Sequence, residues 1–133
     1  MEPNKKTILY VDDDADDREL LGDIMQKTSP ECKIMYAENG LQAIEILTVA
    51  KDKKLLPCLI ILDLNMPYLD GRQTFERIKA DIILNSVPVV ILSSGKNPAD
   101  KSYFGNAGIP YFTKPIDIVD MESLANNLST LCE

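Results

Sequence analysis

The chain has 133 residues, of which 45% are hydrophobic and 26% are charged, a composition typical of one globular domain. Its net charge of −7 argues against nucleic-acid binding through phosphate contacts, which require clustered lysines and arginines. No apolar run approaches the roughly 20 residues of a membrane-spanning helix, and the N-terminus lacks a signal-peptide pattern. A cytoplasmic protein that does not contact membranes is therefore expected.

The histidine and cysteine counts remove further classes of protein. With no histidine, the chain cannot support Ser-His-Asp or Cys-His catalysis, an HExxH metal site or a phosphohistidine of its own. Three cysteines without a CxxC motif predict neither a disulfide framework nor a zinc site. Cys32 and Cys58 neighbour apolar, strand-like residues, so we expect buried free thiols.

The first half of the chain predicts two strands and two helices. Thr7 to Val11 is a short apolar strand, and the acids of DDDADDRE then open a helix that ends at Ser29-Pro30. Lys33 to Ala37 is a second strand. The turn at Asn39-Gly40 leads into an amphipathic helix.

The second half continues the same alternation. The predicted elements are a strand at Cys58 to Leu62, a helix from Gly71 to Ile82, a strand at Pro88 to Leu92, a short helix that starts at Asn97-Pro98 and ends near Gly105 to Gly108, a strand at Ile109 to Thr113 and a last helix from Ile118 to Leu131. Five strands, each followed by a helix, predict a parallel sheet with helices on both faces. The expected fold is therefore α/β, a flavodoxin-like (βα)5 sandwich with strand order 2-1-3-4-5.

Polar residues follow four of the predicted strands, and all of them fall at carboxyl ends. Asp12 and Asp13 follow the first strand, Asp63 the third, Ser93 the fourth and Lys114 the fifth. These ends share one edge of a parallel sheet, where ligands of such sheets bind. One lysine cannot balance three carboxylates, and hard oxygen ligands without imidazole or thiolate favour Mg²⁺, or Mn²⁺ in its place.

Such a site indicates phosphoryl transfer to a carboxylate. Asp63 ends the central strand and is the candidate acceptor, because a carboxylate can form an aspartyl phosphate. Asp12 and Asp13 would hold the metal, Lys114 would neutralise a phosphoryl oxygen, and the Ser93 hydroxyl would donate to one.

Helix capping is the alternative for the acids that follow the first strand. For Asp14, Asp16 and Asp17, capping and a favourable interaction with the helix dipole are the preferred interpretation. Asp12 and Asp13 considered alone could be caps as well. Their arrival with Asp63, Ser93 and Lys114 at one sheet edge favours a functional site.

Four segments resemble the receiver domain of two-component response regulators. They are ILYVDDD (Ile8 to Asp14), LIILDLNMPYLDG (Leu59 to Gly71), PVVILSS (Pro88 to Ser94) and YFTKP (Tyr111 to Pro115). With the intervening helices, the resemblance extends over nearly the whole chain. It implies a stand-alone, chemotaxis-regulator-like receiver over residues 1–133 with no output domain.

The resemblance implies a role for each matching position. Asp63 would accept phosphate from a phosphohistidine on a sensor histidine kinase or a histidine phosphotransfer protein. Asp13 would bind Mg²⁺ directly and Asp12 largely through water, with Asp63 and the backbone carbonyl of Asn65 as further ligands.

The remaining positions imply a conformational switch. Ser93 and Tyr111 match the hydroxyl and aromatic residues that move between inactive and active states, and Asn65 and Ser94 match positions that tune dephosphorylation. The Lys114-Pro115 bond would be cis. The altered outer face would then meet a downstream protein, or a second copy through the last two helices and the strand between them.

Gly95 to Gly108 departs from the common receiver pattern, being about one residue shorter and carrying Pro98. Within it, Tyr103 and Phe104 are expected to pack under the helix rather than contact a partner. Two alternatives to the receiver function stay open: a pseudo-receiver that only binds partners, and a small phosphatase in which Asp12-x-Asp14 supplies an aspartate nucleophile.

Overall fold

The computed structural model describes residues 6–95 and 97–132. Five parallel strands form one sheet in the order β2-β1-β3-β4-β5, which confirms the predicted topology. The strands are β1 (Lys6–Val11), β2 (Cys32–Ala37), β3 (Leu59–Leu62), β4 (Val89–Ser93) and β5 (Tyr111–Thr113). Every residue of β3 and β4 is buried, as expected for strands covered on both faces.

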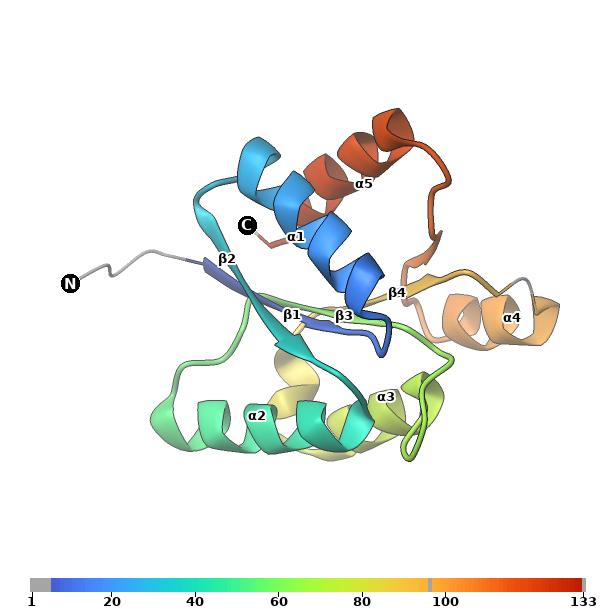
Figure 1. Cartoon of the computed structure of the whole chain (residues 1–133). Coiled ribbons are helices and arrows are strands. Elements are labelled where there is room, and N and C mark those ends of the chain that lie inside the picture. Colours follow the sequence, from blue (N-terminus) through green and yellow to red (C-terminus); the bar gives the residue numbers. More distant parts are fainter. Residues whose placement is uncertain (1–5, 96, 133) are drawn as a thin grey trace.

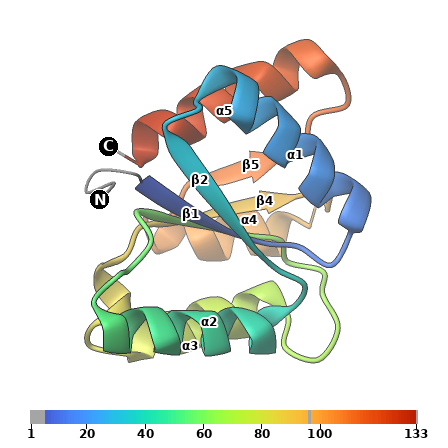
Figure 2. The ribbon, with the colours of Figure 1, turned by 60° about the vertical axis from the view of Figure 1, so that its left-hand side comes forward.

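Helices cover both faces of the sheet (Figure 1). They are α1 (Ala15–Thr28), α2 (Gly40–Lys53), α3 (Gly71–Ala80), α4 (Pro98–Asn106) and α5 (Ile118–Leu131), with a short 3-10 turn η1 (Leu84–Ser86). Figure 2 shows α1 and α5 together on one side of the sheet, with α2 and α3 on the other. Each helix is preceded by an Asp or Asn whose side chain caps it, which fixes where the helices begin.

Two apolar cores follow from this layering, one on each face of the sheet. Phe104 anchors the core beneath α3 and α4, where it is fully buried with its ring centroid 5.2 Å from that of Phe75. Tyr103 packs edge-on against the same pair and lies under the Arg72 guanidinium. The packing predicted for these two aromatic residues is confirmed.

The predicted extension of α3 to Ile82 is wrong. The helix ends at Ala80, because the Asp81 carboxylate accepts hydrogen bonds from the amides of Ile83 and Leu84 and starts the turn of η1. Ile82 consequently lies outside the helix, and 91% of it is exposed.

The expectation of unpaired cysteines holds only in part. Cys32 is a buried free thiol, whereas Cys58, just before β3, forms a disulfide with Cys132, just after α5. The two residues are 74 positions apart in the sequence, with Cα atoms separated by 5.1 Å. Their pairing depends on how the end of α5 meets the sheet, and Cys spacing alone does not reveal that. Within the residues that the structure describes, no helix has the length and apolar character needed to span a membrane.

Candidate metal centre

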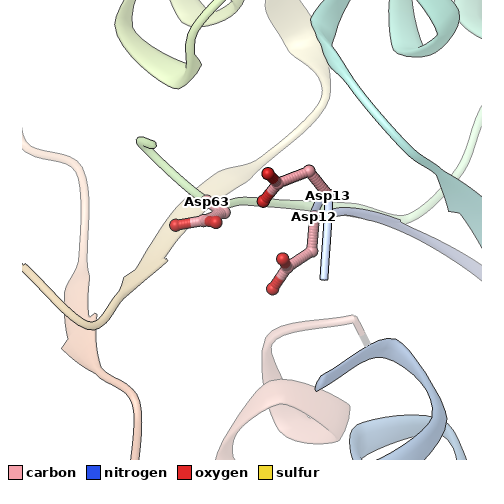
Figure 3. Close-up of side chains that lie close together, drawn as sticks. All are labelled: Asp12, Asp13 and Asp63. Atoms are coloured by element: carbon pink, nitrogen blue, oxygen red, sulfur yellow. The ribbon is translucent and has the colours of Figure 1, made fainter. Parts of the chain in front are cut away.

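Three carboxylates meet at the carboxyl ends of β1 and β3 (Figure 3). Asp12 and Asp13 directly follow β1, and Asp63 directly follows the adjacent strand β3. One oxygen from each of the three lies within 4.8 Å of the others. Asp12 and Asp63 are buried, whereas Asp13 is exposed and opens the cluster to solvent.

Asp63 is the least satisfied member of this cluster. Its Oδ1 atom is buried and has no hydrogen-bond partner among the described residues. Burial raises the pKa of Asp63 to about 6, and the neighbouring charges of Asp12 and Asp13 act in the same direction. The Lys114 ammonium and the backbone amide of Asn65 oppose this rise without cancelling it.

This arrangement suits a hard divalent cation. Mg²⁺ and Mn²⁺ prefer carboxylate and carbonyl oxygens, and the cluster offers a buried oxygen without a donor beside a solvent-facing carboxylate. A bound cation would supply the positive charge that Asp63 Oδ1 lacks. The donor set therefore fits the predicted metal.

Asp12 is held by protein donors on both of its oxygens. Its Oδ2 accepts a hydrogen bond from the Tyr10 hydroxyl at 2.7 Å and lies 2.8 Å from Lys114 Nζ. Its Oδ1 accepts from the Asp14 amide at 2.9 Å. Protein donors therefore occupy three of the roughly four lone-pair positions of this carboxylate.

Sequence reasoning does not identify Tyr10 as part of the site, although its spacing from Asp12 indicates that it belongs there. Tyr10 and Asp12 are two residues apart at the end of a strand, so their side chains emerge on the same side. A tyrosine that is only 1% exposed needs a partner for its hydroxyl, and a carboxylate on the same side provides one.

Lys114 lies among the carboxylates, as its position after β5 predicted. Its Nζ is 2.8 Å from Asp12 Oδ2, 2.8 Å from Asp17 Oδ2 and 3.6 Å from Asp63 Oδ2. Burial by itself lowers the pKa of Lys114, but the hydrogen bonds to Asp12 and Asp17 outweigh it and the net pKa is raised. The ammonium is therefore charged, and two of its three carboxylate neighbours are within hydrogen-bond distance.

The helix-cap interpretation is correct for Asp14 and incomplete for Asp17. Asp14 is the N-cap of α1, and its side chain accepts from the amides of Asp16 and Asp17. The Asp17 carboxylate instead pairs with Lys114 from the far end of the chain, a contact separated by 97 positions. No local sequence pattern indicates such a contact.

The prediction of a cis Lys114-Pro115 bond is wrong, because the described residues contain no cis peptide bond. An X-Pro bond prefers trans by about 0.5–1 kcal/mol unless the fold imposes cis. Here the trans chain already lets the Lys114 amide bond the Ser93 carbonyl at 3.0 Å while its ammonium reaches Asp12. The trans bond is therefore compatible with both contacts of Lys114.

The predicted switch residues Ser93 and Tyr111 are linked to each other through Gly95. Ser93 is buried at the end of β4, where its Oγ accepts a hydrogen bond from the Gly95 amide at 3.1 Å. Tyr111 is half-buried, and its hydroxyl donates to the Gly95 carbonyl at 3.3 Å. Asn65 and Ser94 are exposed beside them. Neither Ser93 nor Tyr111 is hydrogen-bonded to the three carboxylates in the described structure.

A parallel sheet of this order with three acids and a lysine at its carboxyl edge defines a receiver-type domain. The family model for the response regulator receiver domain matches residues 8–126, and the chain belongs to this family. Receiver domains of two-component systems are generally phosphoacceptor switches rather than enzymes. They work with histidine kinases or phosphotransfer proteins and bind Mg²⁺ or Mn²⁺ at an acidic pocket.

Among relatives, the chain is 35% identical to the two-component response regulator ARR17 of Arabidopsis thaliana, over 91% of this chain and 83% of that protein. It is 29% identical to the response regulator Rcp1 of Synechocystis sp., over 94% of this chain and 87% of that protein. The Mn(2+)-bound form of Rcp1 superposes with a TM-score of 0.82 at 27% identity, covering 94% of this chain and 92% of that chain. The phosphorylated cyanobacterial phytochrome response regulator RcpA has the same TM-score and identity, covering 92% and 89%.

Proposed function

We propose that this chain is a Mg²⁺-dependent phosphoacceptor switch in which Asp63 receives a phosphoryl group from a phosphohistidine on a partner protein. The observation that supports this most directly is the unpartnered, buried Oδ1 of Asp63, set beside Asp12, Asp13 and the Lys114 ammonium. A carboxylate oxygen without a hydrogen-bond donor is poised either to bind a cation or to act as a nucleophile.

In the transfer, an oxygen of Asp63 forms a bond to phosphorus while the bond between phosphorus and the donor imidazole nitrogen breaks. The electron pair of that bond returns to the imidazole, which then takes up a proton. The donor must be another molecule, because this chain contains no histidine. A sensor histidine kinase or a histidine phosphotransfer protein has the required chemistry, and small phosphoryl donors can replace it.

Residues of this chain would hold the metal and the transferred group. Asp13, Asp63 and the Asn65 carbonyl would contact Mg²⁺ or Mn²⁺, with Asp12 acting through water. When bound, the cation supplies positive charge against the carboxylates and the phosphoryl oxygens. Lys114 would bond a phosphoryl oxygen, since its ammonium already lies 3.6 Å from Asp63 Oδ2.

The signal would leave the site through Ser93 and Tyr111. Both contact Gly95, so movement of the Ser93 hydroxyl towards a phosphoryl oxygen would break its bond to the Gly95 amide and free the segment that Tyr111 also holds. Such a switch requires that phosphate favour one conformation over the other. The outer face of α4, β5 and α5 would then bind a downstream protein in the cytoplasm, or a second copy, with Asn65 and Ser94 tuning dephosphorylation.

Acetyl phosphate labelling tests this proposal. With Mg²⁺, intact-mass analysis should show one added phosphoryl group on the unmodified chain and none on Asp63→Asn. Asp70→Asn is a suitable control, because Asp70 caps α3 and lies outside the acidic cluster. No labelling or beryllofluoride binding by the unmodified chain would contradict the phosphoacceptor function and leave a binding module. Labelling that survives Asp63→Asn would show that another residue is the acceptor.

A further inference from the structure

We propose that Asp17 is a positioning residue that holds the Lys114 ammonium away from Asp63 until a phosphoryl group arrives. Removal of this carboxylate is then expected to strengthen binding of a phosphoryl group or its analogue at Asp63. The inference rests on the proposed function and assigns to the same site a regulatory residue on helix α1.

Lys114 faces three carboxylates and pairs closely with only two. Its Nζ is 2.8 Å from both Asp12 and Asp17, whereas the 3.6 Å separation from Asp63 exceeds a hydrogen bond. The lysine that should neutralise a phosphoryl oxygen on Asp63 is therefore committed to other partners.

A phosphoryl group on Asp63 would compete for this ammonium, and the two existing partners differ in how readily they release it. Asp12 is fully buried and also accepts a hydrogen bond from the Tyr10 hydroxyl. If Lys114 moved away, Asp12 would become a buried charge without its ion-pair partner, which is strongly destabilising. The Asp17 side chain is 38% exposed, so water can replace the lysine there at small cost. Asp17 is therefore the partner that Lys114 leaves.

This difference makes Asp17 a brake on the phosphorylated state. While the carboxylate is present, any movement of the ammonium towards a phosphoryl oxygen on Asp63 has to overcome its attraction to Asp17, 2.8 Å away. Without it, the ammonium keeps Asp12 and is free to turn towards Asp63. Because the pair is partly exposed, the expected change in affinity is about three- to fivefold rather than orders of magnitude.

Asp16 provides the matched control. It is the preceding residue in the first turn of α1, it is exposed, and it makes no ion pair among the described residues. Asp16→Asn removes the same charge from the same helical turn and so measures the general electrostatic gain for an anion. Asp17→Glu is a second control, because it retains the carboxylate.

The test is a titration of the full chain with beryllofluoride at saturating Mg²⁺, in which calorimetry or amide chemical shifts measure the binding. We expect Asp17→Asn to bind about three- to fivefold more tightly than the unmodified chain, Asp16→Asn to bind within about twofold of it, and Asp17→Glu to return towards it. Thermal unfolding without beryllofluoride is measured in parallel. A merely structural role would lower the midpoint of Asp17→Asn without tightening binding.

Two results would overturn the inference, and they are distinguishable. Equal affinities for Asp17→Asn and Asp16→Asn, or weaker binding by Asp17→Asn, would reject the brake while leaving the phosphoacceptor function intact. Failure of the unmodified chain to bind beryllofluoride would reject the proposed function and the brake together.

Discussion

Gly71, the first residue of α3, packs against the backbone that carries Asp63, and replacing it with alanine should disturb both fold and site. Its amide donates to the Leu64 carbonyl at 3.1 Å. A Cβ at this position would overlap the Asp63 carbonyl oxygen and lie 2.7 Å from Leu64 Cα. Backbone atoms cannot rotate away as a flexible side chain can, so the loop from β3 to α3 must move.

The cost can be estimated from this geometry. Overpacking a well-packed site costs about 1–3 kcal/mol, and contact with backbone places Gly71→Ala in the upper part of that range, about 2–3 kcal/mol. For a domain of this size, about 3–5 °C of unfolding midpoint is lost per kcal/mol, so a decrease of roughly 6–15 °C is expected. Gly105→Ala is the control, since a Cβ there meets nothing within 4 Å and a helical alanine should add about 0.5–1 kcal/mol.

The assay combines thermal unfolding by far-ultraviolet circular dichroism with acetyl phosphate labelling below the transition. Gly71→Ala should unfold earlier and label more slowly, because the displaced backbone carries the acceptor. Gly105→Ala should unfold slightly later and label normally. The reasoning would be refuted if Gly71→Ala unfolded within about 2 °C of the unmodified chain and labelled at the same rate.

Three further predictions concern the cluster and the core. Burial raises the pKa of Asp63 to about 6, from an ordinary value near 3.9. Ionisation of this carboxyl therefore destabilises the metal-free fold by up to about 3 kcal/mol. This destabilisation is absent below about pH 4 and complete above about pH 6. Asp63→Asn should therefore stabilise the metal-free protein by about 1–3 kcal/mol at neutral pH and by nothing near pH 4, and equal effects in urea unfolding at both pH values would contradict this. Tyr10→Phe removes the donor that orients Asp12 and should weaken Mn²⁺ binding, measured by calorimetry, by about tenfold. Tyr36 pairs with Tyr10 in the β1–β2 register, and Tyr36→Phe is the control that should change the affinity little. Equal affinities in both variants would argue against the orienting role of Tyr10. Phe104→Ala should lower the free energy of unfolding, measured by denaturant titration, by about 3–5 kcal/mol. A loss below about 1 kcal/mol would mean that neighbouring side chains move in to fill the cavity.

The fold could be predicted because its determinants are local. Apolar runs without alternation mark strands that are buried on both faces, and a capping Asp or Asn marks the start of α1 and of α4. The meeting of Asp12, Asp13 and Asp63 was also predictable, since parallel connections place every carboxyl end at one edge of the sheet. Topology alone brings these residues together.

The partners of Lys114 were not predictable in the same way, and the reason is physical. Topology places the ammonium near the acids, but which oxygens it binds depends on competition among three carboxylates at distances of a few ångströms. Lys114 pairs with Asp17 rather than Asp63 because α1 places the Asp17 carboxylate 2.8 Å from the ammonium. Asp12 also pairs with Lys114, because burial and the Tyr10 hydroxyl fix the position of the Asp12 carboxylate. The Lys114 ammonium is 0.8 Å closer to Asp17 than to Asp63, and residue spacing in the sequence cannot predict a difference of this size. That difference determines whether the lysine pairs with the phosphoacceptor or with a carboxylate of α1.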